Sequence, residues 1–402
     1  MTSGRRGATA LATIALAVSL LMGACTSLTP SPSSVASGGG VSSSSPVPAG
    51  SATAPSQTAA PTATPIPPGG VYAATVSGQI DPSLAGVPER VYVPNETSGD
   101  VTVIDPATFK VVGHFATGAY PEHITPDWDL QRLYVSNMNG GTLTPVDPRT
   151  SQPGAKISLP IFPYAVYFTL DGAKAMVVTD YISPKLVKDN GIHFYDRTTW
   201  KLLRYVQVPW PGADDLDLSA DGSYLLVSCE YSGVVAKVDT NKMEVTGHVN
   251  VGSLPRDVRL APDGRTFFVA NEGLDGIQIV DPQAMTVTGF IPTGDGAHGI
   301  EFSRDTTQMF VANRAAGSIS VIDIATLKVV ATWHVGGSPD EMVLSPDGSQ
   351  LWASNRYHAS VSVIDTTTGK VITTIPVGSR PHGLTYWPQP GRMSIGQNGN
   401  MR

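Results

Sequence analysis

Cysteine is scarce in this chain of 402 residues, which contains only Cys25 and Cys229. Disulfide bonds therefore cannot form the framework of a domain, which must depend on its hydrophobic core. Cys229 is expected to be a small buried apolar residue. The sequence also has no Cys-x-x-Cys-His motif, Gly-x-Ser-x-Gly elbow, phosphate-binding loop or dinucleotide fingerprint. Covalent haem, an α/β-hydrolase serine and nucleotide-phosphate chemistry are therefore set aside.

Charge is absent from one long segment: residues 26–70 contain no Asp, Glu, Lys or Arg. The segment consists mainly of Ser, Thr, Pro, Ala and Gly. Such a composition buries too little apolar surface to offset the entropy of ordering the chain. Residues 26–70 are therefore predicted to be a disordered tether, and a flexible coil of this length spans roughly 35–40 Å.

The residues before this tether have the pattern of an export signal. Arg5 and Arg6 precede a charge-free stretch, residues 8–24, that is too short for a comfortable membrane span. The stretch ends in Leu-Met-Gly-Ala-Cys at 21–25, which resembles the lipobox of bacterial lipoproteins. The resemblance implies a signal peptide over residues 1–25 and acyl chains on Cys25, which would anchor the protein to the outer face of the cell membrane. A plain secretory signal stays open, because Met22 is unusual at its position.

The net charge argues against two classes of partner. The formal charge of −7 becomes −9 when Arg5 and Arg6 are removed with the signal. Neither nucleic acid nor an anionic lipid surface is therefore expected as the main partner of the remaining chain.

An internal repeat is the strongest pattern in the sequence. Each unit has an acidic residue that opens a tight turn, and successive units are separated by 42, 50, 42, 42 and 42 residues. These residues are Asp129, Asp171, Asp221, Asp263, Asp305 and Asp347. Each unit also holds four short strands rich in β-branched residues, and helical periodicity is absent. Four strands in about 42 residues are typical of one blade of a β-propeller.

The count of strands predicts seven blades over residues 71–388. The second strand of each blade is expected at 91–93, 133–135, 175–177, 225–227, 267–269, 309–311 and 351–353. Because the chain begins on a second strand and ends on an innermost strand near 382–387, these two segments should pair and close the ring. Residues 389–402 are then predicted to be a flexible tail.

Several of these repeats resemble a known family. The sequences Tyr-Val-Ser-Asn at 134–137, Phe-Val-Ala-Asn at 268–271 and 310–313, and Ser-Pro-Asp-Gly at 345–348 are similar to those of the YVTN-repeat propellers. That family is exported and related to lactonase-like and cytochrome d1-like propellers. The resemblance covers roughly residues 85–388 and implies the fold, but not one function, since such propellers carry many activities. Two blades depart from the pattern, with Asp180 and Cys229 in place of the motif's Asn.

Polar residues gather where the innermost strands begin. The two residues at each start are Glu122-His123, Tyr164-Ala165, Asp214-Asp215, Arg256-Asp257, His298-Gly299, Asp340-Glu341 and His382-Gly383. Strand order places these starts on one face, around the mouth of the central channel, and the Asp-Gly turns on the other face. The ligand-binding residues predicted from this arrangement are Glu122, His123, Tyr164, Asp214, Arg256, His298, Asp340 and His382.

A transition-metal site is one interpretation of this mouth. His298, His382, His123 and Asp340 come from four consecutive blades and could converge on zinc, copper or iron. Strand alternation opposes the inclusion of His123, which is offset by one residue and should point the other way. A polar funnel for a small ligand and purely structural polarity remain open as alternatives.

Two classes of function follow from the mouth. The favoured hypothesis is a binding or scaffold module for a small polar ligand or for an envelope protein or glycan. The alternative is an enzyme, either a lactonase-like hydrolase or a metal- or cofactor-assisted oxidoreductase. In the hydrolase, His298 or His382 would be the general base, Asp340 or Glu341 would orient it, and Arg256 would stabilise negative charge. The eight extra residues of the third blade, within 181–191, could form a lid over either site.

Overall fold

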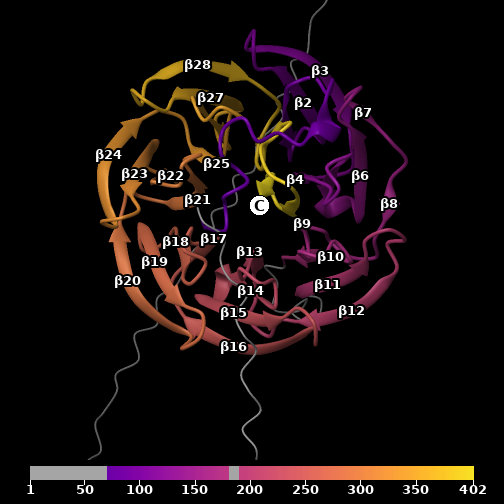
Figure 1. The fold of residues 1–402 in the computed structure, drawn as a ribbon. Coiled ribbons are helices and arrows are strands. Elements are labelled where there is room, and N and C mark those ends of the chain that lie inside the picture. The colour runs from indigo at the N-terminus through magenta and orange to yellow at the C-terminus, as the bar shows by residue number, and fades with distance from the viewer. Residues whose placement is uncertain (1–69, 181–189) are drawn as a thin grey trace, which may run out of the picture. The chain divides into compact units, whose positions relative to one another are not determined.

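The structure is a computed structural model that describes residues 70–180 and 190–402. The predicted signal peptide with Cys25, the predicted tether up to residue 69 and most of the third-blade insertion lie outside the described residues. Seven β-sheets stand like blades around a central axis (Figure 1). Within the two described ranges, no helix is both long and apolar enough to cross a membrane.

The blades run from an innermost to an outermost strand. Blade 1 consists of β29 (Thr385–Trp387), β1 (Arg90–Asn95), β2 (Asp100–Asp105) and β3 (Lys110–Ala116). Blade 2 has β4 (Pro121–Pro126), β5 (Leu133–Asn137), β6 (Thr142–Asp147) and the short β7 (Gln152–Pro153) and β8 (Ile157–Ser158). Blade 3 has β9 (Ala165–Phe168), β10 (Lys174–Thr179), β11 (Gly191–Asp196) and β12 (Leu202–Gln207). Blade 4 has β13 (Ala213–Leu218), β14 (Tyr224–Cys229), β15 (Val234–Asp239) and β16 (Glu244–Asn250).

The remaining blades are the most regular. Blade 5 has β17 (Pro255–Leu260), β18 (Phe267–Asn271), β19 (Gly276–Asp281) and β20 (Thr286–Pro292). Blade 6 has β21 (Ala297–Phe302), β22 (Gln308–Asn313), β23 (Ser318–Asp323) and β24 (Lys328–His334). Blade 7 has β25 (Pro339–Leu344), β26 (Gln350–Asn355), β27 (Ser360–Asp365) and β28 (Val371–Pro376). Among the described residues, three single-turn helices lie in loops: η1 (Pro82–Leu84), η2 (Met138–Gly140) and η4 (Glu230–Ser232).

The ring closes as the sequence predicts. The C-terminal strand β29 pairs antiparallel with β1, and Val91 lies opposite Tyr386. Three strands from the beginning of the propeller and one from its end therefore make blade 1. This pairing satisfies the backbone groups that an open ring would leave exposed at two edges.

Packing between blades explains the hydrophobic pattern of the strands. In β2 and β27 the four central residues are all buried, because each blade is covered by a neighbour on both faces. The outermost strand β16 instead alternates between exposed and less exposed residues, since one of its faces meets water. The core is shared across blades: Ile192 of blade 3 and Leu225 of blade 4 belong to one buried cluster.

The Asp-Gly turns occupy the face opposite the channel mouth and shape the hairpins. In blade 5 the Asp263 carboxylate accepts a hydrogen bond from the Arg265 backbone N–H at 2.9 Å, and Gly264 has a φ of 70°. A left-handed residue at this point favours glycine. These turns have the structural role that the sequence predicts.

The structure corrects the prediction of a flexible tail. Residues 394–402 form strands β30 (Ser394–Gly396) and β31 (Asn400–Met401), which extend the sheet of blade 3 beyond β9. Ile395 and Met401 are buried, and the Arg402 guanidinium lies 2.8 Å from the Asp217 carboxylate. Figure 1 shows this yellow segment at the centre of the ring. Seven innermost strands leave a channel that their own side chains do not fill, and the C-terminal segment fills part of it.

Cys229 is fully buried, and burial raises the pKa of its thiol well above the usual range. The thiolate that reacts with disulfide reagents is therefore not formed at neutral pH. In a Cys25→Ser chain, we expect an aromatic disulfide reagent to modify Cys229 only as the propeller unfolds in denaturant. Rapid stoichiometric modification of the native protein, with an unchanged circular dichroism spectrum, would contradict this burial.

Candidate functional site

In five of the seven blades, a β-bulge at the start of the innermost strand sets both residues of the pair opposite one residue of the neighbouring strand. In blade 5, Pro255 lies opposite Asn271 and Val258 opposite Val269, so Arg256 and Asp257 together face one residue. The same irregularity occurs in β4, β13, β21 and β25. A bulge re-aims side chains and cancels the simple alternation of a strand. We call the residues of these seven pairs the first ring.

The bulge overturns the prediction that His123 points away from the other histidines. The ring centroid of His123 lies 4.7 Å from that of His382 and 4.9 Å from that of Tyr164. Its Nδ1 atom lies 2.9 Å from the Asn398 side-chain oxygen. Burial lowers the pKa of His123 to about 4, so the imidazole is neutral. His123 therefore belongs to the mouth but is tied to the C-terminal segment.

A serine supports three of the bulges. The Ser136 hydroxyl accepts a hydrogen bond from the His123 backbone N–H at 3.2 Å. Ser228 and Ser354 accept equivalent bonds from the backbone N–H groups of Asp215 and Glu341 at 3.1 and 3.2 Å. Sequence reasoning missed this role. The signal was the residue directly before the motif's Asn, which is Ser in some blades and Ala in others.

A second ring surrounds the first and consists of the residue that follows each second strand. Its members are Glu96, Met138, Asp180, Glu230, Glu272, Arg314 and Arg356. The registers also correct the alignment of blade 3: Thr179, not Asp180, holds the position of the motif's Asn. Asp180 instead takes the second-ring position equivalent to Glu230. All seven residues occupy the same position of the repeat, and this shared position was the signal that could have identified the ring.

Arginines of the mouth are engaged by carboxylates of both rings. Arg256 forms ion pairs with Glu230 and with Glu272, the latter at 2.6 Å. Because two carboxylates hold its guanidinium, Arg256 is not free to stabilise a developing anion as the hydrolase hypothesis requires. Arg380 lies in the loop just before the pair His382-Gly383, and its guanidinium is 2.8 Å from the Glu96 carboxylate.

Asp340 is the centre of the ion-pair network. Its buried carboxylate contacts Arg314 and lies 3.3 Å from Arg356. Burial alone would raise the pKa of this carboxyl, but Arg314 and Arg356 outweigh burial and lower the pKa to about 2. Asp340 is therefore ionised at neutral pH.

The structure brings His298 and His382 against this carboxylate. His298 Nδ1 lies 3.5 Å from Asp340 Oδ1 and 3.1 Å from Glu341 Oε1. His382 Nε2 lies 3.6 Å from Asp340 Oδ2, and its Nδ1 lies 2.7 Å from Glu122 Oε2. Burial and nearby arginines lower the pKa of both histidines well below the usual value. Both imidazoles are therefore neutral and can each offer a lone pair.

Carboxyl groups outnumber guanidinium groups at the mouth. The two rings together with Arg380 carry ten carboxyl groups and four guanidinium groups. Burial raises the pKa of six of these carboxyls: Glu122, Asp180, Asp214, Asp215, Asp257 and Glu341. Neighbouring acids, such as Glu96 beside Glu122 and Asp214 beside Asp215, add to this effect. The site therefore has more buried acid than its own arginines can balance.

A cavity of about 230 Å³ opens at the mouth among these groups. Glu122, Tyr164, Asp214, Arg256 and His298 of the first ring line it together with five second-ring residues. Asp180 and Asp214 each present a buried carboxylate oxygen without a hydrogen-bond partner. Burial and the nearby Asp214 raise the pKa of the Tyr164 phenol well above its usual value, so its hydroxyl stays protonated.

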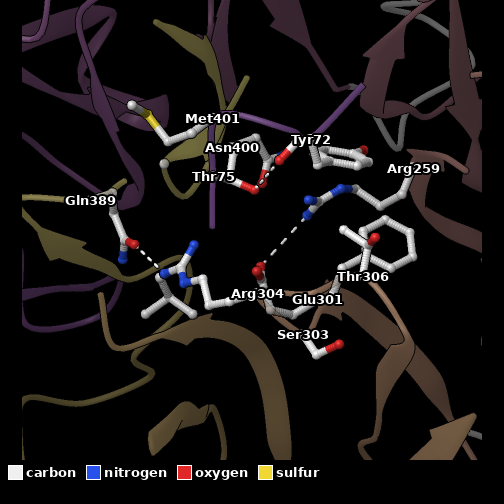
Figure 2. Close-up of a pocket in the computed structure, with 13 residues that line it drawn as sticks. Tyr72, Thr75, Arg259, Glu301, Ser303, Arg304, Thr306, Gln389, Asn400 and Met401 are labelled. Carbon is white, nitrogen blue, oxygen red and sulfur yellow. Dashed lines mark hydrogen bonds and ion pairs between the residues drawn. The ribbon is translucent and has the colours of Figure 1, made fainter. Parts of the chain in front are cut away.

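The opposite end of the channel is closed by the terminal segments of the propeller. Tyr72 donates a hydrogen bond to the Leu260 carbonyl at 2.8 Å, and Met401 and Gln389 line the same region. Figure 2 shows Arg259 pointing toward Glu301 and Arg304 toward Gln389. The cavity enclosed there is only about 20 Å³, which is room for about one water molecule. The mouth is therefore the better candidate for a ligand.

Known protein families agree with this architecture. Residues 72–389 match the model of the YNCE-like beta-propeller family. The chain belongs to this family. Membership in the YNCE-like family confirms the predicted repeat propeller and refines the resemblance to the YVTN-repeat group. No curated protein sequence matches this YNCE-like chain.

Solved structures share the fold of this YNCE-like propeller. A functionally unknown protein from Desulfotomaculum acetoxidans is 19% identical with a TM-score of 0.64, covering 74% of this chain and 98% of its own. Hydrazine synthase of Kuenenia stuttgartiensis is 19% identical with a TM-score of 0.56, covering 65% and 87%. The dihydro-heme d1 dehydrogenase NirN, in complex with DHE, is 15% identical with a TM-score of 0.55, covering 73% and 74%. These similarities show the fold alone.

The floor of the YNCE-like mouth contains a residue that sequence reasoning missed entirely. The Asn398 side chain donates to Glu341 Oε2 at 2.7 Å and its oxygen faces His123. Asn398 lies in the segment expected to be a flexible tail, which carries no part of the repeat. No pattern in the sequence indicated that it would return to the channel.

Proposed function

We propose that this YNCE-like propeller is an extracytoplasmic binding module whose mouth cavity takes a small, positively charged solute. The excess of buried carboxyl groups at the mouth is the observation that carries the proposal. A buried carboxyl without a cation has a raised pKa because its charged form is poorly solvated. A bound cation would restore the ionised form of these groups and gain their attraction in a medium of low dielectric constant.

The shape of the channel supports a small ligand. The cavity of about 230 Å³ is below the range of about 300–1,000 Å³ that is typical for drug-sized molecules. The far end of the channel is blocked by Tyr72, Gln389 and Met401. A solute would therefore enter and leave through the mouth, with Asp180 and Asp214 in its path.

The location of this module is proposed from the sequence. The lipobox-like residues 21–25 and the charge-free residues 26–70 support export and a lipid anchor on Cys25. A tether of roughly 35–40 Å would let the propeller sample solutes at some distance from the membrane surface. The partners of the chain are then the membrane, through the anchor, and a cationic solute at the mouth.

Ligand-dependent stability tests the binding function. We expect divalent metal ions or small organic amines to raise the thermal unfolding midpoint of the full chain, and anions such as citrate to leave it unchanged. A ligand at 100 times its dissociation constant adds about 2.7 kcal/mol to the free energy of unfolding. Tryptophan fluorescence during heating is a suitable measurement, since the chain has six tryptophans.

A matched pair of variants locates the effect. The double variant Asp180→Asn/Asp214→Asn keeps the shape of both side chains and should weaken cation binding by at least about tenfold. Asp263→Asn, in an exposed hairpin turn on the other face, should bind as the native chain does. Stabilisation by anions only, or equal cation affinity in the mouth variant, would refute the proposal.

Catalysis is the second candidate, and the contact of His298 with Glu341 favours it. A neutral imidazole 3.1 Å from a carboxyl group resembles an oriented general base. Hydrazine synthase and NirN, which share the fold, are themselves enzymes. Arg256, however, is held by Glu230 and Glu272, so the proposed stabiliser of negative charge is absent. Saturable turnover of a bound solute, abolished in His298→Gln, would favour the enzyme over the binding module.

A further inference from the structure

We infer that His298, Asp340 and His382 form a binding site for one divalent first-row transition metal ion, with zinc as the reference ion. This inference rests on the proposed function and identifies the cation. One ligand atom of each residue lies within 4.8 Å of the other two. The contacts from the histidines to Asp340 measure 3.5 and 3.6 Å. Ligand atoms about 2.0–2.1 Å from a tetrahedral zinc ion are about 3.3 Å apart, so these contacts are close to the required spacing.

The donor set fits such an ion. Two neutral imidazoles and one carboxylate are ligands that zinc and ferrous iron accept, whereas calcium and magnesium prefer oxygen alone. The three residues come from β21, from β25 and from the segment just before β29. His298 and Asp340 are held on innermost strands, and His382 is buried in the segment that leads into β29, which favours a fixed ligand geometry.

Unpartnered nitrogen atoms point to a missing ligand in the cluster. His382 Nε2 and His298 Nδ1 are buried and have no well-directed hydrogen bond. Leaving such atoms unsatisfied costs about 1–3 kcal/mol each. Because both lie beside the two oxygens of Asp340, a metal ion bound between them would satisfy all three side chains.

Surrounding groups orient the ligands. Glu122 Oε2 lies 2.7 Å from His382 Nδ1, so this carboxyl group is close enough to orient the metal-binding histidine. The Asp340 carboxylate is fixed by Arg314 and Arg356. These two guanidiniums are shared with Glu272 and Glu96, so their positive charge at the cluster is largely balanced.

The cluster adjoins the mouth cavity through one residue. All three residues are buried, and of them His298 lines the cavity whereas Asp340 and His382 do not. A metal ion at the cluster would therefore be reached from the cavity past the His298 ring. With three protein ligands, a fourth position is left for water or for a solute in the cavity.

The test uses the full chain without a polyhistidine tag, stripped with EDTA and titrated with Zn²⁺ against a fluorescent chelator. We expect one zinc ion per chain by elemental analysis, and a cobalt(II) spectrum of low-coordinate, nitrogen-rich type. His298→Gln/His382→Gln should weaken zinc binding by at least about 1,000-fold. His334→Gln, at an exposed position on β24, is the matched control and should bind as the native chain does.

A third variant separates ligand from supporting residue. Glu122→Gln should keep one zinc ion per chain but weaken binding by about 10- to 100-fold, as loss of a group that orients a ligand does. Equal zinc affinity in the double histidine variant, folded by circular dichroism, would overturn the site. If zinc fails to bind while organic amines still stabilise the chain, the metal site is wrong and the binding module stands. If no cation binds, both are wrong.

Discussion

Replacing Asp340 with alanine is expected to lower the free energy of unfolding by about 3–5 kcal/mol, the cost of removing one partner from a buried ion pair. Asp340 is fully buried and contacts both Arg314 and Arg356. Its removal would leave two largely buried guanidiniums with less compensation for their charge. Denaturant unfolding in the presence of EDTA measures this change without a contribution from bound metal.

The matched control for Asp340 lies in the same blade. Asp347 is an exposed turn residue whose carboxylate accepts a hydrogen bond from the Ser349 backbone N–H at 3.0 Å. Asp347→Ala should lower the free energy of unfolding by only about 1 kcal/mol, because water replaces the hydrogen bonds that this exposed carboxylate accepts from Ser345 and Ser349. The free energy of unfolding of Asp340→Asn should fall between those of the two alanine variants. The amide oxygen can still accept a hydrogen bond, but it carries no charge. Equal unfolding midpoints for Asp340→Ala and Asp347→Ala would show that the network does not stabilise the fold.

Removing residues 391–402 is expected to lower the free energy of unfolding by at least about 5 kcal/mol. The segment buries Ile395 and Met401, each worth about 1.5–3 kcal/mol. It also supplies the guanidinium of Arg402 to the buried Asp217, and losing a buried ionic partner costs about 3–5 kcal/mol. Thermal unfolding of the shortened chain is the measurement.

A conservative change in the same segment provides the control. Met401→Leu keeps the volume and apolar character of a buried side chain and should cost less than about 1.5 kcal/mol. An unfolding midpoint of the shortened chain equal to that of the Met401→Leu chain would show that the segment does not stabilise the ring. Such a result would also remove Asn398 as a structural support for His123 and Glu341.

Repetition explains why the fold could be predicted from the sequence. Each unit of about 42 residues repeats the same turn and strand pattern. A strand that is assigned wrongly in one unit can therefore be recognised by comparison with the other units. Closure through residues near Tyr386 follows from the offset between the first and last strands, and the structure confirms it. The starts of the innermost strands could be assigned to one face for the same reason, which is why Asp340 and His382 were found.

Other parts of the site depend on local geometry that the repeat does not encode. Strand alternation predicted that His123 points away from His382, but the bulge in β4 turns it toward the channel. The second ring was overlooked because its members differ in charge, from Glu96 to Arg356. These residues can be recognised as one ring only when the loops of all the blades are seen around the common axis.

The class of fold, the number of blades, the closure of the ring and the face that carries the polar residues could all be inferred from the amino-acid pattern. Strand periodicity and turn chemistry are local properties of the chain. Because they recur in every repeat, they can be recognised from the sequence. The folded arrangement was needed to show which carboxyl groups pair with arginines and which histidines approach Asp340. It was also needed to show that Asn398 forms the floor of the mouth. These contacts join residues from different blades and from a segment outside the repeat, and their distances are set by how seven sheets pack around a common channel.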